Sequence, residues 1–223
     1  FRSLGLEVVA YALYAPPLLR TALEREDPDL RSRLQQQAIN ADVLYKTHIK
    51  GVYADLLEFM GSMVQPMDSA QQEFWQHSQV AAFQLVEAVK DAHRLQRNMY
   101  KYLQEPDDCA ARSSYLELRL YMLQTLKDIR VLSVSELPES QWVQELQALD
   151  ASVAAFDAQF RKHLFASIRG GLLDGLTVSS LMNDLGFAQT IIHGLRQVLL
   201  LGEGHEAARQ QQLLMGDAPL IQA

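Results

Sequence analysis

The chain has 223 residues, of which 48% are hydrophobic, and a formal net charge of −7 at pH 7. This length is enough for one large domain or two small ones with a sizeable core. The negative charge argues against a general nucleic-acid binder, because neutralising phosphates requires a basic face.

The first part of the chain is predicted to form two short helices. Residues 3–14 are apolar and are followed by Pro16, which pushes the residue before it out of the helical region. Residues 17–25 are expected to form another short helix. The most apolar run, Val8–Leu19, has 12 residues, whereas a membrane-spanning helix needs about 20.

The next two predicted helices are long. Asp27 and Pro28 suit the cap and the first position of a helix over 28–62. The longest helix, 68–104, has apolar residues at steps of three and four, with one polar break. We call such a line of residues along one side of a helix a seam. The seam expected in the first of these helices is Ile49, Val52, Leu56, Phe59 and Met63. The seam expected in the second is Leu85, Val89, Ala92, Gln96, Met99 and Leu103.

Three further long helices are predicted, at 108–133, 138–168 and 176–201, and a polar one at 205–215. Asp107 and Asp108 are expected to cap the first of them, and Thr177 the last. The pair Gly170-Gly171 supplies a left-handed stop between the helices at 138–168 and 176–201. The residues that we expect to be almost fully buried are Val153, Phe156, Phe160, Leu185, Ile192 and Leu195.

The seam of 68–104 recurs 96 positions later, so that Leu85 corresponds to Leu181 and Leu103 to Leu199. The helix over 28–62 corresponds to 138–168 at a shift of 97. We therefore predict an all-α antiparallel helical bundle of five or six main helices, built from two related halves without a separating linker.

The candidate metal ligands lie on the longest predicted helix. Glu87 and Asp91 are four residues apart and could share a hard or borderline cation. Asp128, on the following helix, could supply a further oxygen. A helical wheel puts Glu87 and Asp91 on the outer face with Lys90 and Arg94, so the alternative interpretation is a solvated, charge-paired face.

Other kinds of site find little support. A ferritin-like di-iron centre needs inward Glu-x-x-His pairs, and the sequence contains none. It also contains no Gly-rich phosphate loop and no Gly-x-Ser-x-Gly nucleophile motif. We therefore expect no enzyme. Arg112, Tyr115 and Arg119 share one helix face and are interpreted as a packing surface or, alternatively, as a docking surface.

Three stretches resemble a known family. Glu87 to Asp91 fits the Glu/Asp-x-x-x-Asp signature of PhoU-like domains. The stretches that begin at Leu85 ("LVEAVKDAHRLQRNMYKYL"), Tyr115 ("YLELRLYMLQTLKDI") and Ser179 ("SSLMNDLGFAQTIIHGL") are similar to the version that follows sodium–phosphate cotransporter domains. The resemblance implies a tandem three-helix PhoU-like repeat over 35–202, between an N-terminal connector, 1–34, and a C-terminal tail, 203–223.

The resemblance also implies a function. The chain would be the cytoplasmic regulatory domain of a sodium-dependent phosphate cotransporter-like protein, at the cytoplasmic face of the inner or plasma membrane. Its partner would be an N-terminal transmembrane transport domain of the same chain. The sequence begins at Phe1, and we take it as a fragment from which that domain is absent. We also expect a possible homodimer and no nucleic-acid partner.

The metal would be a divalent or iron-type ion bound by Glu87 and Asp91, with Asp128 as an additional ligand. A second site is expected to be lost, because Asn183 and Phe187 stand where its carboxylates would be. The alternative function is a free-standing adaptor or signalling bundle that regulates a separate phosphate transporter or kinase.

Overall fold

The computed structural model describes residues 9, 43, 45–62, 68–106 and 108–200. Within these ranges every element is a helix, as the sequence predicts. No helix among them is long and apolar enough to cross a membrane. The predicted helices at 3–14, 17–25 and 205–215 lie outside the described residues, apart from Val9, which is fully buried.

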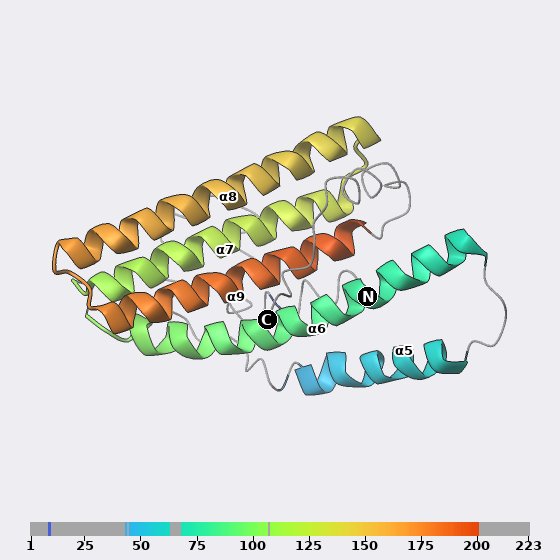
Figure 1. The fold of residues 1–223 in the computed structure, drawn as a ribbon, viewed down its shortest axis with the longest axis horizontal. Helices are drawn as coiled ribbons and strands as arrows, with labels where there is room; N and C mark the ends of the chain where they lie inside the picture. Colours follow the sequence, from blue (N-terminus) through green and yellow to red (C-terminus); the bar gives the residue numbers. More distant parts are fainter. Residues whose placement is uncertain (1–8, 10–42, 44, 63–67, 107, 201–223) are drawn as a thin grey trace.

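Four long helices, α6, α7, α8 and α9, pack together as a bundle, and a shorter helix, α5, lies beside α6 (Figure 1). The most extensive helix–helix contact joins α6 and α9. The elements are η1 (Tyr45–Ile49, π-helical), α5 (Lys50–Ser62), α6 (Ser69–Leu103), α7 (Ala110–Val134), α8 (Glu139–Arg169) and α9 (Gly175–Leu200).

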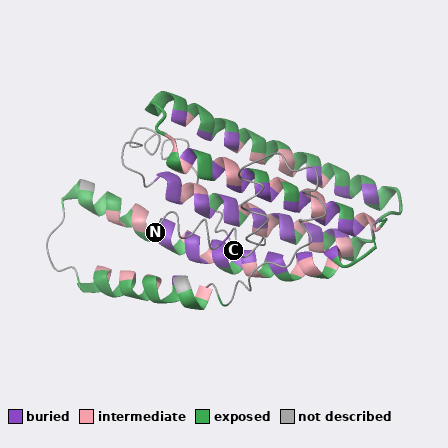
Figure 2. Cartoon of the chain, turned by 180° about the vertical axis from the view of Figure 1, so that it is seen from behind, coloured by how far each residue is buried: buried purple, intermediate pink, exposed green. Residues whose placement is uncertain are grey.

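The core is built from the predicted seams of α6 and α9. Leu85 and Leu181 are fully buried, and the other seam residues of both helices are buried with them (Figure 2). The two helices therefore turn corresponding faces inward. Superposition of the two halves of the chain stays a prediction.

The seam expected over 49–63 was only partly correct: Ile49 of η1 is fully buried, but the part of the seam on α5 does not lie in the core, and Met63 lies outside the described residues. None of the described residues of α5 is buried, and Val52 and Phe59 are 41% and 56% exposed. Phe59 touches α6 through Trp75, with ring centroids 5.8 Å apart. The N-terminal part of α6 extends past the other three long helices (Figure 1), so α5 has little to pack against.

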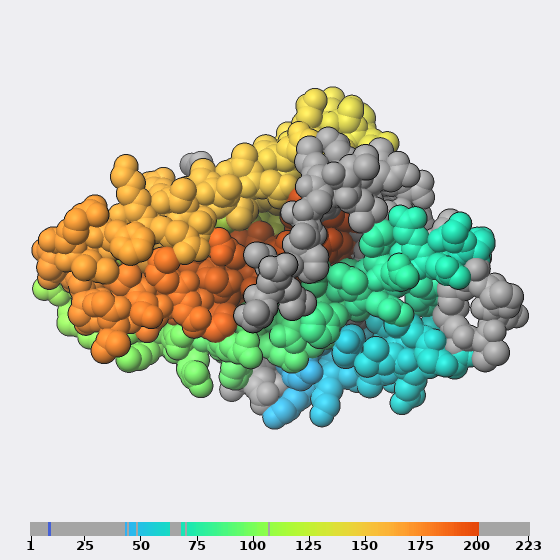
Figure 3. Space-filling view, in the orientation of Figure 1, coloured from blue at the N-terminus to red at the C-terminus, as the bar shows by residue number. Residues whose placement is uncertain are grey.

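The prediction for α8 was partly wrong. Phe160 is fully buried, but Val153 and Phe156 are only half-buried. The reason is that α8 packs against α7 and α9 on one side, whereas its other side forms the upper margin of the molecule in Figure 3. Phe156 is shielded by a flat stack on Tyr121 of α7, with centroids 3.6 Å apart. Leu185, Ile192 and Leu195 are buried, as expected.

The turn between α8 and α9 follows the glycine prediction. Gly171 has φ 68°, the left-handed conformation that glycine adopts without strain. The Leu172 N–H donates to the Ser167 carbonyl at 2.9 Å, and the Gly171 N–H donates to the Ile168 carbonyl at 3.0 Å. This pair of bonds is a Schellman motif, which satisfies carbonyls at the end of α8.

Two cap predictions were wrong. The α9 cap is Asp174 rather than Thr177, because an Asp174 oxygen accepts from the Thr177 N–H at 2.7 Å. This hydrogen bond lowers the pKa of the Asp174 carboxyl. The N-cap of α7 is Cys109, without a side-chain hydrogen bond, so Asp108 does not cap it; Asp107 lies outside the described residues.

Candidate functional site

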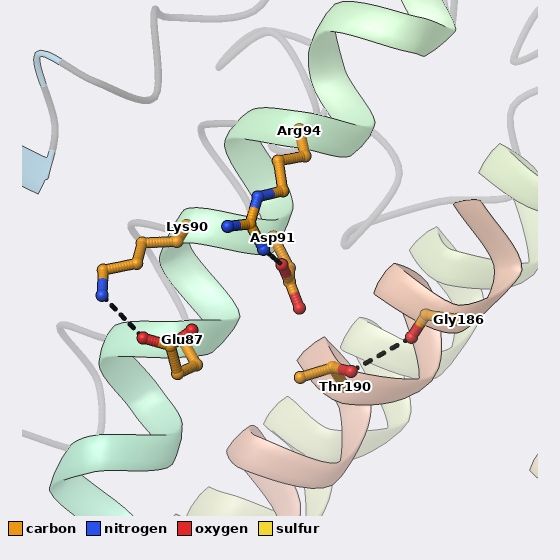
Figure 4. A network of polar contacts seen from close by, with 6 residues as sticks. All are labelled: Glu87, Lys90, Asp91, Arg94, Gly186 and Thr190. Carbon is orange, nitrogen blue, oxygen red and sulfur yellow. Dashed lines mark hydrogen bonds and ion pairs between the residues drawn. The ribbon is translucent and has the colours of Figure 1, made fainter. Parts of the chain in front are cut away.

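The predicted metal ligands Glu87 and Asp91 both lie on α6, and each is paired with a cation three residues further on (Figure 4). Lys90 Nζ lies 2.6 Å from Glu87 Oε1, and an Arg94 guanidinium nitrogen lies 2.6 Å from Asp91 Oδ1. The charge-paired interpretation of this face is therefore correct in its contacts.

The outward placement of Asp91 was wrong. Its exposed fraction is 5%, because its carboxylate points toward α9 rather than away from the bundle (Figure 4). The Arg94 guanidinium lies over the Phe187 ring of α9, 5.6 Å from its centroid. Burial raises the pKa of the Asp91 carboxyl, and the hydrogen bond and charge of Arg94 oppose that shift.

The third predicted ligand, Asp128, lies on α7 and accepts a hydrogen bond from Gln124 at 2.8 Å. Among the residues that the structure describes, no three His, Cys, Asp or Glu side chains form a group that could hold a metal ion. Lys90 and Arg94 each pair with one carboxylate oxygen, so a cation that bound Glu87 and Asp91 would share these carboxylates with two positive charges.

The most unusual polar group is Asp184 on α9, a residue that the sequence analysis did not select. Its exposed fraction is 0%. The Tyr115 hydroxyl of α7 donates to one carboxylate oxygen at 2.5 Å, and the Asn98 amide of α6 donates to the other at 2.7 Å. The Tyr115 ring also stacks on Tyr102, with centroids 4.6 Å apart. One carboxylate thus joins three helices.

The electrostatics of this cluster follow from its burial. Removal from water raises the pKa of the Asp184 carboxyl, and the hydrogen bonds from Tyr115 and Asn98 oppose that shift. Burial and the neighbouring carboxylate raise the pKa of the Tyr115 hydroxyl, so that it stays a neutral donor. An ionised carboxylate is costly in the interior unless hydrogen bonds satisfy it.

A sequence signal for Asp184 does exist. It is three residues after Leu181 and four before Ala188, so it lies within the α9 seam. Arg112, Tyr115 and Arg119 are all buried on α7, which confirms the packing interpretation of that face and excludes the docking alternative for these three residues.

Comparisons of the chain with protein-family models, with characterised proteins and with solved structures give no match. Over the described residues the structure is an all-α bundle, in which the fully buried carboxyl group of Asp184 joins α6, α7 and α9.

Proposed function

We propose that this bundle is the cytoplasmic regulatory domain of a sodium-dependent phosphate cotransporter-like membrane protein, and that it modulates transport by docking rather than by catalysis. The proposal rests on the PhoU-like stretches of the sequence. Its partner is the transport domain that the resemblance places before it in the same chain.

One observation carries this proposal. Each of the three stretches that carry the resemblance contributes one side chain to the same buried cluster: Asn98, Tyr115 and Asp184. Asn98 lies 86 positions before Asp184 in the sequence, and Tyr115 lies 69 positions before it. The similarity therefore falls on residues that act together in the fold.

The cluster suits a domain that transmits a mechanical signal. A satisfied polar group in the core fixes the register of the helices around it, because a shift of any helix would break a buried hydrogen bond. Since Asp184 is fully buried, it has no access to a substrate. The domain would then act as one rigid body through its surface.

A divalent or iron-type ion at Glu87 and Asp91 is an additional element of the proposal, not a requirement. It would compete with the positive charges of Lys90 and Arg94, each of which pairs with one carboxylate oxygen. One oxygen of Asp128 accepts from Gln124, and its other oxygen could be the ligand.

The test is sodium-dependent uptake of labelled phosphate by cells that make the full-length protein. We compare the intact protein with a variant carrying Tyr115→Phe and with one from which the bundle is deleted. Deletion is expected to change the uptake rate or its response to external phosphate, and Tyr115→Phe to do so more weakly.

A full-length protein that takes up no phosphate in a sodium-dependent manner contradicts the proposal. If deletion changes nothing, the regulatory role is wrong. If the bundle, expressed as a separate chain, controls a separate transporter, the adaptor alternative is correct.

A further inference from the structure

A stripe of exposed cations runs along the outer side of α6. It consists of Lys90, Arg94, Arg97 and Lys101, and all four residues are exposed. Their steps of four, three and four place them within about 60° of arc on the helix. At 1.5 Å per residue the stripe is about 16 Å long.

Two more exposed lysines, Lys46 and Lys50, lie nearby on η1 and at the start of α5. η1 packs against α6. The hydrogen bond to Glu87 is the main cause that raises the pKa of Lys90, and Tyr45 of η1 is close enough to add to that shift. We call the four α6 cations together with Lys46 and Lys50 the basic face.

The acids beside the basic face only partly neutralise it. On α6, Glu87 and Asp91 pair with two of the four cations, and Arg97 and Lys101 have no acidic partner among the described residues. Asp91 is turned toward α9, away from the crest of the stripe (Figure 4). The chain as a whole carries −7, so the charge is strongly asymmetric.

We propose that the basic face docks this domain onto an anionic membrane surface. The cations of the stripe lie along the outer side of α6, so all of them can face a flat surface at the same time. Lys and Arg side chains can extend from that side into the headgroup region, and anionic lipids attract each of them. The acidic remainder of the chain is repelled, so the domain is held in one orientation.

This inference deepens the proposed function, but it rests on the charge pattern and not on the PhoU-like resemblance.

The experiment is co-sedimentation of the purified chain with vesicles of phosphatidylcholine containing roughly 30% phosphatidylserine. Binding is expected at low salt and is expected to be lost near 1 M salt, where the screening length falls to about 3 Å. The double variant Arg97→Gln/Lys101→Gln removes two cations that have no acidic partner in the described structure, and it is expected to bind about 30-fold more weakly.

The matched control is Lys162→Gln/Arg169→Gln, which removes two exposed cations from α8, on the other side of α7 and α9 (Figure 1). It changes the net charge equally and is expected to bind like the wild type. Circular dichroism checks that both variants are folded.

Three results would overturn the proposal: equal binding to pure phosphatidylcholine vesicles, equal loss in the control, or tighter binding to duplex DNA or polyglutamate than to the anionic vesicles. None of them bears on phosphate uptake, so this inference and the proposed function can fail independently.

Discussion

At the scale of single residues, the Asp184 cluster places a fully buried carboxyl group in the core. Both of its donors, Tyr115 and Asn98, are neutral groups. Hydrogen bonds to neutral donors offset part of the cost of burying a charge, but they supply no opposite charge. The folded state therefore favours the protonated carboxyl more than the unfolded state does.

This preference predicts a pH dependence of stability. The folded pKa of Asp184 is raised above its ordinary value of 3.8, so the folded state keeps a proton that the unfolded state has released. The contribution of Asp184 to stability is then fully present below the ordinary pKa and is lost as pH rises through the folded pKa. We expect Asp184→Asn to flatten the stability curve measured by urea unfolding as the pH rises above about 4.

Asp174 provides a control of opposite sign. Its folded pKa is lowered, so its contribution to stability is lost on acidification, and Asp174→Asn should remove a slope in the other direction. An unchanged slope in Asp184→Asn would show that Asp184 titrates normally. Asp91 also has a raised pKa and adds a slope of the same sign in both variants.

The second prediction concerns the tyrosine. Tyr115→Phe removes one of the two donors and leaves a buried carboxylate oxygen without a partner, so we expect a loss of about 1–3 kcal/mol in the free energy of unfolding. Urea unfolding at neutral pH measures it. In the Asp184→Asn background the loss should be smaller, and a double-mutant cycle gives the coupling. Equal losses in both backgrounds contradict the cluster.

The third prediction concerns metal binding at Glu87 and Asp91. Because Lys90 and Arg94 place two positive charges against these carboxylates, calorimetric titration of Mn²⁺ into the wild type is expected to show weak binding. Lys90→Ala/Arg94→Ala should bind more tightly, and Glu87→Ala/Asp91→Ala should not bind. Unchanged affinity in the last variant would place any site elsewhere in the chain. Binding should weaken in acid, since protonation removes a ligand charge.

At the scale of elements, α6 and α9 approach each other very closely at Gly194. A Cβ at this position would lie 2.8 Å from the backbone oxygen of Gln84 and 3.3 Å from the Ala88 Cβ. A backbone atom cannot move aside as a side chain can, so an added methyl group would push the two helices apart.

Gly194→Ala is therefore expected to destabilise the protein by about 1–3 kcal/mol, although alanine favours a helix. The matched control is Gly186→Ala on the same helix, where nothing lies within 4 Å of the added Cβ. It should stabilise by about 0.5–1 kcal/mol. Thermal unfolding of both variants measures the difference, and equal shifts of the two variants would mean that α6 and α9 are not in tight contact.

The elements also show what the sequence could predict. The bounds of α6, α7, α8 and α9 were predicted to within two residues. This was possible because Gly, Pro and acidic residues at the ends of the seams mark helix ends in the local sequence. The exposure of Val52 could not be predicted, since a seam does not reveal whether another helix covers it. The partners of Asp184 could not either, because they lie on two other helices.

At the scale of the whole molecule, the helices are held unequally. α8 buries six of its 31 residues, whereas α9 buries 12 of 26 (Figure 2). Polar contacts complete the attachment of α8: Arg196 to Asp150 at 2.6 Å, Gln189 to Asp157 at 2.7 Å, and His163 to Glu117 at 2.9 Å. Partly exposed contacts of this kind contribute little each and weaken in salt.

This inequality predicts the order in which the bundle opens. Regions with few buried apolar contacts open at a lower free energy than the core does. Native-state hydrogen exchange should therefore show the backbone amides of α8 exchanging before those of α9, and the gap should widen as salt is added. The exposed end of α8 is the most informative place to look, because Phe165 there is 50% exposed while Phe160 is fully buried. Equal protection of α8 and α9 at all salt concentrations would mean that the four long helices open as a single cooperative unit, and that the polar contacts of α8 are stronger than their exposure implies.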